Sequence, residues 1–505
     1  MPRPWDVGHD RQAVGRSAAA GRAVLAALVL ACLTLAGCGL RVSSGQERSA
    51  LGAALGKGQG GGSGNGGSGP TANTGSSAEA GAASASGSAS SLAPGASGSG
   101  SAAQQALVAA GGLTAGGAAG SPAPSAGNGG ATDVGVTGTT ITVGNVSDLG
   151  GPVPGLFQGG PYGVQAYFSY VNSQGGVYGR QLKLATSDDG LQCSQNESDY
   201  QNRVGSVFGF VGSWSLDDNC GAQIMSGHPG VPMVQTYLNP QMAGLPNAYA
   251  MAPYDQQFYL GPYLYLKQKY PDAITSVGTI VGNQAAAVAA WQHLKSAIQT
   301  IGYQVQYEDD FPPAQSNFSA DVLRMKSQNI KMVILSSVNA PDAAIFSQEA
   351  AQQGYKPEVW VCVVCYSGGY IQNGGGAAAV EGQYEYLATA AFLNDPTVPE
   401  VATYLHWLHT DYPSFQPDLF STYSWANAAL FVHILQQVGP HLTQKAVLAA
   451  LAATTSFNDN GMTTTANING KKPSNCYNLF QIQGGQYVKV DDPPTGFRCD
   501  GYFAG

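Results

Sequence analysis

The chain has few of the residues and motifs that nucleic-acid binding, metal binding or covalent chemistry requires. Lys and Arg together number only 22 in 505 residues and form no basic run, which argues against a nucleic-acid partner. The seven histidines are scattered, which limits metal binding and acid–base catalysis. A Ser-centred nucleophile elbow, a phosphate-binding loop and an HExxH motif are all missing. We therefore expect no enzyme, no cofactor and no metal.

Long apolar runs are also scarce. Ala23–Ala36 is apolar and follows a leader that carries four arginines, but it is shorter than the roughly 20 residues of a membrane-spanning helix. This pattern predicts a secretory signal. It ends in Leu35-Ala36-Gly37-Cys38, which looks like a bacterial lipobox, so we expect cleavage before Cys38 and lipid on that cysteine; ordinary cleavage nearby is the alternative. The mature protein should be extracytoplasmic and lipid-anchored to the cell membrane.

The next hundred residues have few charges and almost no aromatic side chains. They consist mainly of Gly, Ser and Ala, which cannot bury enough apolar area to offset the entropy lost on ordering. The globular remainder exceeds one typical core, so two lobes are expected. The predicted divisions are a signal peptide (1–37), a disordered tether (38–135), first-lobe segments (136–254 and 389–455) and second-lobe segments (255–388 and 456–505, the last with a terminal hairpin).

Strand-like apolar runs alternate with stretches of helical spacing in the globular part. This alternation predicts βαβ units, an α/β fold and two doubly wound parallel sheets. Longer helices are expected at Glu400–Asp411, Leu419–Val438 and Thr443–Ala452. The predicted strands are Thr140–Val146, Gln181–Ala185, Val207–Val211, Val231–Gln235, Val277–Val281, Gln304–Tyr307, Met332–Leu335 and Glu358–Val364, with a hairpin of Tyr477–Ile482 and Tyr487–Val490.

Polar or aromatic residues stand at the carboxyl ends of these strands, where open parallel sheets bind ligands. Hydroxyl and amide groups there can replace the water around a small solute, and aromatic faces can hold its apolar part. The same residue types also cap helices, so a capping role accounts equally well for any single one of them. The candidate contacts are Ser213, Trp214, Ser215, Tyr237, Asn239, Asn283, Gln284, Asn339 and Tyr366.

The segments "ITVGNVSDLGG" and "YVNSQGGVYGR", followed by a strand and Asp188-Asp189, resemble the type I periplasmic binding proteins. More narrowly, they resemble the branched-chain amino-acid (Leu/Ile/Val) substrate-binding lipoproteins of ABC transporters. The resemblance implies two Rossmann-like lobes joined by a three-strand hinge. It also implies a monomer that captures a small ligand (amino-acid-like, amide or carboxylate) and meets an ABC permease and its ATPase. The likeness is specific in the first hundred residues of the globular part and thin after them.

In this family a hydroxyl-rich loop after the third strand grips the ligand carboxylate, which implies Ser213 and Ser215 here. The second lobe departs from the pattern. The family places an acid after the strand matching Glu358–Val364 to pair with the ligand ammonium, but this chain has no acid between Glu358 and Glu381. A buried ammonium needs a compensating charge or several acceptors. We therefore expect a neutral or carboxylate-bearing ligand with an apolar or aromatic portion.

Six cysteines remain after the signal and the lipid site, an even number in a compartment where disulfides persist. The family often bridges the regions of Cys193 and Cys220, and Cys476 and Cys499 bracket the predicted hairpin. Cys362 and Cys365 are then left as a third pair. They end a β-run instead of opening a helix, which favours a structural disulfide over free thiols or a redox or metal site.

Three other functions stay open from the residues alone. A ligand sensor would use the same cleft. A thiol–disulfide oxidoreductase would use Cys362 and Cys365, and a structural cell-wall protein would need no cleft at all.

Overall fold

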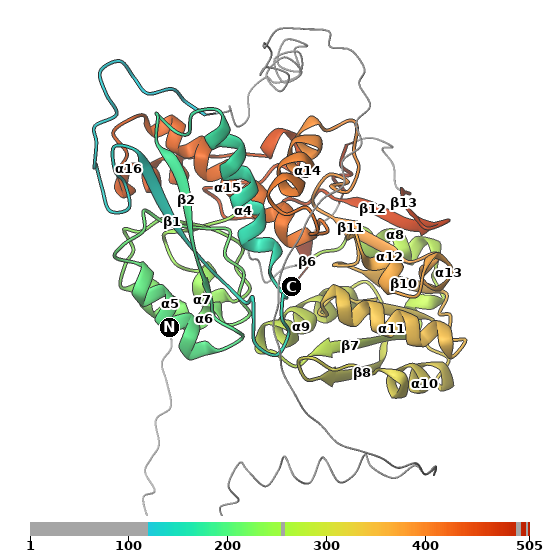
Figure 1. The fold of residues 1–505 in the computed structure, drawn as a ribbon. Coiled ribbons are helices and arrows are strands. Elements are labelled where there is room, and N and C mark those ends of the chain that lie inside the picture. Colours follow the sequence, from blue (N-terminus) through green and yellow to red (C-terminus); the bar gives the residue numbers. More distant parts are fainter. Residues whose placement is uncertain (1–119, 254–257, 491–495, 501–502, 505) are drawn as a thin grey trace, which may run out of the picture. The chain divides into compact units, whose positions relative to one another are not determined.

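All eight strands predicted before the hairpin are found in a computed structural model, which describes residues 120–253, 258–490, 496–500 and 503–504. The signal peptide, Cys38 and most of the predicted tether lie outside the described residues. Two mixed α/β lobes contain these strands, one built on a five-stranded sheet and one on a seven-stranded sheet. Figure 1 shows both sheets with helices packed around them.

The first lobe is built on a wholly parallel sheet of order β2-β1-β3-β4-β5. Its strands are β1 (Thr140–Ser147), β2 (Gln181–Asp188), β3 (Phe210–Val211), β4 (Met233–Val234) and β5 (Ala248–Tyr249). Its helices are α4 (Gly159–Ser173), α5 (Cys193–Arg203), α6 (Asp218–Ser226), α7 (Pro240–Ala243), α14 (Pro399–Asp411), α15 (Leu419–Val438), α16 (Gln444–Ala453) and η2 (Asp459–Gly461).

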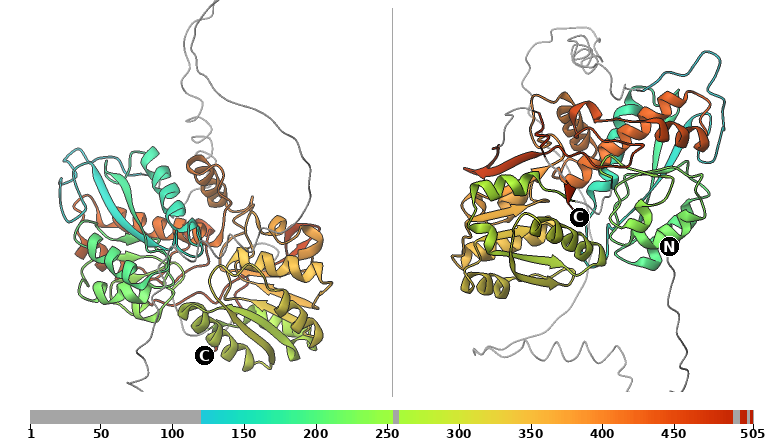
Figure 2. Two further views of the ribbon diagram at one scale, coloured as in Figure 1. Left: turned by 60° about the horizontal axis from the view of Figure 1, so that its bottom comes forward. Right: turned by 180° about the vertical axis from the view of Figure 1, so that it is seen from behind.

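Alternation along the short central strands gives this sheet two apolar faces. Phe210 and Met233 pack in one core cluster, whereas Val211 and Val234 pack in the other. One cluster includes α4 and α15, which lie side by side although they are far apart in the sequence (Figure 2). Gly163 allows this close approach, because a Cβ there would lie 2.1 Å from the Ser421 carbonyl oxygen.

The second lobe is built on a mixed sheet of order β13-β12-β11-β10-β9-β7-β8, in which the β11–β12 and β12–β13 pairs are antiparallel and the other pairs are parallel. Its strands are β7 (Val277–Gly282), β8 (Val305–Phe311), β9 (Met332–Leu335), β10 (Val359–Cys362), β11 (Tyr384–Leu387), β12 (Asn478–Gln483) and β13 (Gln486–Lys489). Its helices are α8 (Gly261–Lys269), η1 (Ala273–Thr275), α9 (Ala285–Gln299), α10 (Ser319–Ser327), α11 (Ala340–Gln352), α12 (Tyr370–Asn373) and α13 (Ala377–Val380).

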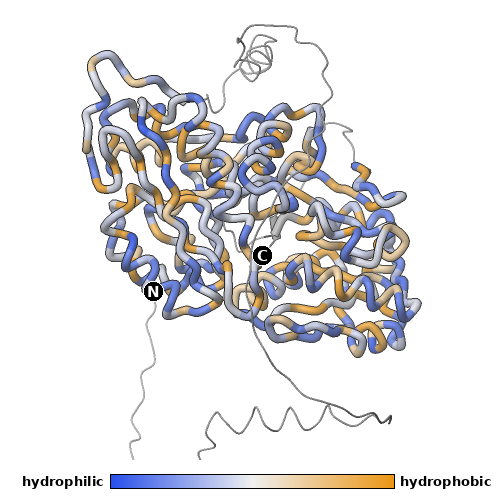
Figure 3. The backbone as a smooth tube through the Cα atoms, in the orientation of Figure 1, coloured by the Kyte–Doolittle hydropathy of each residue, from blue (hydrophilic) through white to orange (hydrophobic). Residues whose placement is uncertain are grey.

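The second sheet also buries both faces. Met332 and Ile334 face the core made with α8 and α9, whereas Val333 and Leu335 face the core made with α10 and α11. Figure 3 shows hydrophobic residues recurring through both lobes, with hydrophilic residues between them on the helices. A separate two-stranded ladder joins β6 (Phe258–Tyr259) to β14 (Phe503–Ala504). Within the described ranges, no helix has both the length and the apolar character needed to cross a membrane.

Two predicted boundaries need correction. The last part of the predicted tether, 120–135, is bound to the first lobe, where buried Arg180 donates to the carbonyl oxygens of Asn128 and Gly130. The predicted second-lobe segment from 456 also begins too early. Helix η2 packs on α14 and α15, and Asn460 donates to Glu400 at 3.1 Å, so the chain enters the second sheet only at β12.

All three predicted cysteine pairs are disulfides: Cys193–Cys220, Cys362–Cys365 and Cys476–Cys499. The first joins α5 to α6, and the last closes the segment that contains the β12–β13 hairpin. Asp188, the first of the two adjacent acids, accepts hydrogen bonds from the backbone amides of Leu149, Gly150 and Gly190. Its role is therefore to hold these loops.

Candidate functional site

A pocket of 350 Å³ lies where residues after the strands of both lobes meet, and we call it the interlobe pocket. Its volume falls in the range of small-molecule sites. The first lobe contributes Val153, Leu156, Phe157, Trp214, Leu216, Tyr237, Leu238, Ala252, Pro253 and Phe420. The second lobe contributes Gly282, Gln284, Ala286, Ala287, Ala290, His293, Phe311, Pro313, Ser336, Ser337, Val338, Asn339, Asp342 and Val364.

Trp214 forms the aromatic wall on the first-lobe side. Its ring centroid lies 5.7 Å from that of Phe157 and 5.0 Å from that of Phe420. The indole Nε1 donates to Ser424 Oγ at 2.9 Å, and the backbone amide donates to Ser147 Oγ at 3.0 Å. The side chain is therefore held in one orientation, and the polar edge of the indole is satisfied inside the protein.

Ser213 and Ser215, which flank Trp214, do not line the interlobe pocket. Ser213 Oγ accepts a hydrogen bond from the Val146 amide at 3.1 Å, and Ser215 Oγ accepts one from Asn196 Nδ2 at 3.1 Å. Both side chains are buried. The prediction that these hydroxyls grip a ligand carboxylate is therefore not supported by their positions, because they hold the loop instead.

In the loop after β4, too, one predicted contact lines the pocket and the other does not. Tyr237 lines the interlobe pocket, while its hydroxyl donates to the Met233 carbonyl oxygen at 3.2 Å. Asn239 does not line the pocket, because its side-chain amide donates to Asp218 at 2.7 Å and to the Leu216 carbonyl at 2.9 Å. Burial raises the pKa of Asp218 to about 7. This loop therefore offers the pocket a mainly apolar surface.

A buried carboxyl group also supports this rim from behind. Asp148 is fully buried and accepts hydrogen bonds from the backbone amides of Leu191 and Leu216, at 3.0 Å and 2.8 Å. Burial and the neighbouring Asp189 raise the pKa of Asp148 to about 9. The hydrogen bond from the Leu216 amide to Asp148 positions Leu216 at the pocket wall.

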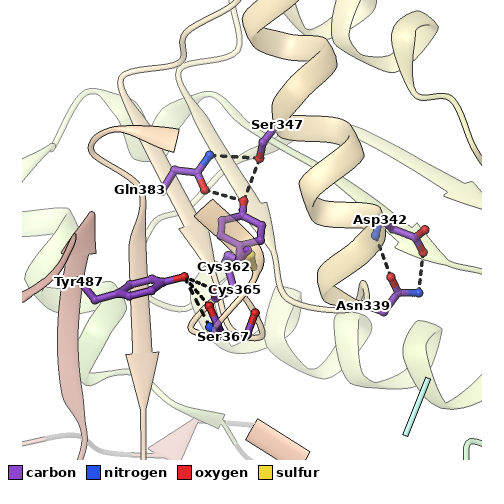
Figure 4. The surroundings of a disulfide bond; sticks show 9 residues. Asn339, Asp342, Ser347, Cys362, Cys365, Ser367, Gln383 and Tyr487 are labelled. Atoms are coloured by element: carbon purple, nitrogen blue, oxygen red, sulfur yellow. Dashed lines mark hydrogen bonds between the residues drawn. A yellow bond between two sulfur atoms is a disulfide. The ribbon is translucent and has the colours of Figure 1, made fainter. Parts of the chain in front are cut away.

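The second-lobe rim carries the polar side chains that line the pocket. Gln284 precedes α9 without capping it, whereas the neighbouring Asn283 is exposed and outside the lining. Asn339 caps α11: its Oδ1 accepts from the Asp342 amide at 2.8 Å, and its Nδ2 donates to Asp342 Oδ2 at 2.7 Å (Figure 4). Burial raises the pKa of Asp342 to about 6. Sequence reasoning missed Asp342, although an acid three residues after an N-cap Asn was its available signal.

Asp342 bears on the expectation of a neutral or carboxylate-bearing ligand, which rested on the absence of an acid after β10, where the family pattern places one. Here an acid reaches the pocket from another element, the first turn of α11. His293, Ser336 and Ser337 were also absent from the predicted contacts. The Ser336 hydroxyl is buried and has no hydrogen-bond partner in the described structure.

The Cys362–Cys365 disulfide constrains the loop after β10, which forms part of the pocket wall. Val364, inside the disulfide loop, lines the interlobe pocket, whereas the predicted contact Tyr366 does not. Tyr366 packs on Phe480 and Tyr487, with ring centroids 4.9 Å and 4.4 Å away. The Tyr487 hydroxyl donates to the Cys365 carbonyl oxygen at 2.6 Å (Figure 4), which fixes the loop from the other side.

Tyr366 instead borders a second cavity of 610 Å³, the hinge cavity, whose lining includes Ala390, Asp395, His409 and Phe480. Although it is larger, this cavity does not lie at the facing strand ends, so we assign the site to the interlobe pocket. No group of three or more His, Cys, Asp or Glu side chains in the described ranges is placed to hold a metal ion.

Two α/β lobes with mainly parallel sheets, and a small pocket at their facing strand ends, define the type I class of solute-binding proteins. Residues 140–486 match the family model described as "Periplasmic binding protein", and the chain belongs to this family. A curated relative, "Leu/Ile/Val-binding protein homolog 7" of Brucella abortus, is 22% identical over 315 residues, which cover 59% of this chain and 77% of the relative. The chain therefore has a solute-binding role.

Solved structures share the fold at low sequence identity. A fatty acid ABC transporter substrate-binding protein from Thermomonospora curvata is 20% identical with a TM-score of 0.61, covering 74% of this chain and 95% of that chain. A solute-binding protein from R. palustris in complex with benzoate is 14% identical with a TM-score of 0.58, covering 72% and 97%. A leucine-binding protein from Thermotoga maritima is 16% identical with a TM-score of 0.56, covering 70% and 98%.

Proposed function

We propose that this protein is an extracytoplasmic, lipid-anchored receptor that captures a small organic molecule in the interlobe pocket and delivers it to an ABC importer. The observation that carries the proposal is a pocket between the strand ends of both lobes, with apolar and aromatic groups on one rim and both polar and apolar groups on the other. Such a lining fits a ligand with an apolar body and one polar end. Trp214, Tyr237, Gln284 and Asn339 are the predicted contacts retained in this proposal.

The chemistry of the pocket supports binding without covalent change. Cys362 and Cys365 are 1% and 0% exposed, so a protein or small thiol has no direct access to their disulfide. We therefore favour a receptor over a thiol–disulfide oxidoreductase. In such a receptor, ligand binding favours the conformation in which both rims contact the solute.

A thermal-shift screen of the purified protein tests this function. The panel contains leucine, benzoate, a medium-chain fatty acid and 3-phenylpropylamine. A ligand at about 100 times its dissociation constant stabilises the native state by about 2.7 kcal/mol, which is measurable as a rise in Tm. The rise should be lost in Ala287→Phe, which fills the pocket, and kept in Ala285→Phe, whose exposed side chain lies outside the lining.

A complete absence of stabilisation across the panel and a wider set of apolar metabolites would contradict the receptor function. Stabilisation that survives Ala287→Phe would place the ligand elsewhere. Delivery to an importer is tested separately by solute uptake in cells, where Cys38→Ala should reduce uptake by releasing the receptor from the membrane.

A further inference from the structure

We propose that Asp342 makes the interlobe pocket select ligands whose polar end is a cationic amine. The inference rests on the proposed function, because it concerns the ligand that this receptor captures. It depends on the position of one carboxyl group, on its hydrogen bonds and on the charges around it.

Among the described residues that line the pocket, Asp342 carries the sole carboxyl group. Its side chain is 6% exposed, and its described hydrogen bonds are both with Asn339, so the same neighbour orients the carboxyl group and caps the helix (Figure 4). Asn339 donates to Oδ2, which leaves Oδ1 to be satisfied by a ligand. The carboxyl group is therefore fixed in place before any ligand arrives.

The surroundings do not neutralise this carboxylate. The described residues of the lining include no Lys or Arg, and none of the described cationic side chains forms an ion pair with Asp342. His293 is the one basic side chain among the described lining residues, and it contributes no such ion pair. A charged group in an apolar site is unfavourable until an opposite charge joins it, and an ammonium group supplies that charge.

A second polar atom supports a donor-bearing ligand end. Ser336, which follows β9 and lines the pocket at the same rim, has a buried hydroxyl oxygen that no described residue hydrogen-bonds. An ammonium group has three N–H donors and can reach several acceptors at once. The opposite rim, with Phe157, Trp214 and Leu216, offers a mainly apolar surface, so the rest of the ligand should be hydrocarbon or aromatic. A carboxylate end would meet the Asp342 charge with no cation between them.

Three probes with the same phenylpropyl body test this selection: 3-phenylpropylamine, 3-phenylpropanol and 3-phenylpropionate. Calorimetric titration should give the tightest binding for the amine and the weakest for the carboxylate, with at least tenfold between the two. Asp342→Asn keeps the shape and the Asn339 contact, and it should weaken the amine at least tenfold while changing the alcohol less than threefold. Asp321→Asn is the matched control, because Asp321 is a buried acid in the first turn of α10 outside this pocket.

The outcomes separate the two proposals. The selection by Asp342 is wrong, and the receptor function stands, in either of two cases. In the first, the alcohol binds and the carboxylate has the same affinity as the amine. In the second, Asp342→Asn leaves the ratio of the amine affinity to the carboxylate affinity unchanged. If none of the three probes binds, the pocket does not accept the phenylpropyl group, and the inference about the polar end of the ligand fails with it. Loss of alcohol binding in Asp342→Asn would show a structural role in place of a selective one.

Discussion

In the first lobe, the polar groups at the strand ends are hydrogen-bonded within their own loops, whereas in the second lobe polar groups line the interlobe pocket. Ser213, Ser215 and Asn239 bond to backbone amides, to Asn196 and to Asp218, and they leave Trp214 and Leu216 to form the wall. In the second lobe, Gln284, Ser336, Ser337 and Asp342 reach the pocket itself.

The difference follows from how each rim is built. The first-lobe loops begin with backbone turns that need support, such as Gly212 at φ +63°, where a Cβ would lie 2.3 Å from Val164 Cγ2. Buried amides and carboxyl groups in such loops must be paired, and the polar side chains supply the pairing. In the second lobe α11 is capped by Asn339 alone, so neighbouring polar groups stay available to a ligand.

Removing the aromatic wall should have the largest effect. Trp214→Ala deletes a side chain that is 5% exposed and contacts Phe157 and Phe420. We expect a loss of about 3–5 kcal/mol in the free energy of unfolding, together with loss of ligand binding. Urea denaturation measures the first, and calorimetry measures the second. A loss below about 1 kcal/mol would mean that the first-lobe rim does not depend on this side chain.

Breaking the hydrogen-bond network that supports the first-lobe rim should have the next largest effect on stability. Asn196 donates to Asp189 and Ser215 and accepts from the Gly221 amide, all within the protein. Asn196→Ala leaves these buried groups unpaired and should cost about 1–3 kcal/mol of stability. Denaturation of the variant without ligand measures this loss. An unchanged midpoint would contradict the structural role that we assign to this network.

The Asp342 carboxyl should give a smaller, pH-dependent effect. The pKa of Asp342 is raised from 3.8 to about 6 in the folded state, which therefore binds the proton more tightly than the unfolded state does. The contribution of Asp342 to stability consequently falls as the pH rises through this range. Asp342→Asn should therefore stabilise the ligand-free protein above pH 6, by about 1–2 kcal/mol after allowance for solvent in the pocket. Below pH 4 the variant and the wild type should agree.

Thermal unfolding of both proteins at several pH values measures the Asp342 effect. A stabilisation that is equally large at pH 4 would show that it arises from packing and not from ionisation.

A polar group of the second rim should matter least for stability. Ser337→Ala removes a partly exposed hydroxyl that lines the pocket and should change the free energy of unfolding by no more than about 0.5 kcal/mol. Its ligand affinity should change more than its stability. The comparison of the two rims fails if Ser337→Ala destabilises the protein as much as Asn196→Ala does.

Most of the fold could be predicted because its signals are local. The apolar spacing and the Asp418 cap mark helix α15, and the predicted range Leu419–Val438 agrees with the structure. Strands β3 and β4 were predicted at five residues, but each is only two residues long. Pairing depends on the neighbouring strand, which a local apolar run does not specify.

The site was harder to predict, because neighbouring loop residues point in different directions. Ser213, Trp214 and Ser215 are adjacent, yet only Trp214 lines the pocket. Tyr366 was placed at the pocket because it follows β10, whereas the disulfide loop presents Val364 there instead. Asp342 was missed because the spacing from Asn339 marks the start of α11 but does not specify that the first turn of this helix faces the pocket.

The most direct test of the account is a calorimetric titration of the purified protein with 3-phenylpropylamine at several temperatures, followed by recovery of the probe. We predict one site per chain, a negative heat-capacity change from burial of apolar surface, and a chemically unchanged probe. A heat flow that continues as the probe is converted, or binding without a negative heat-capacity change, would contradict capture in an apolar interlobe pocket.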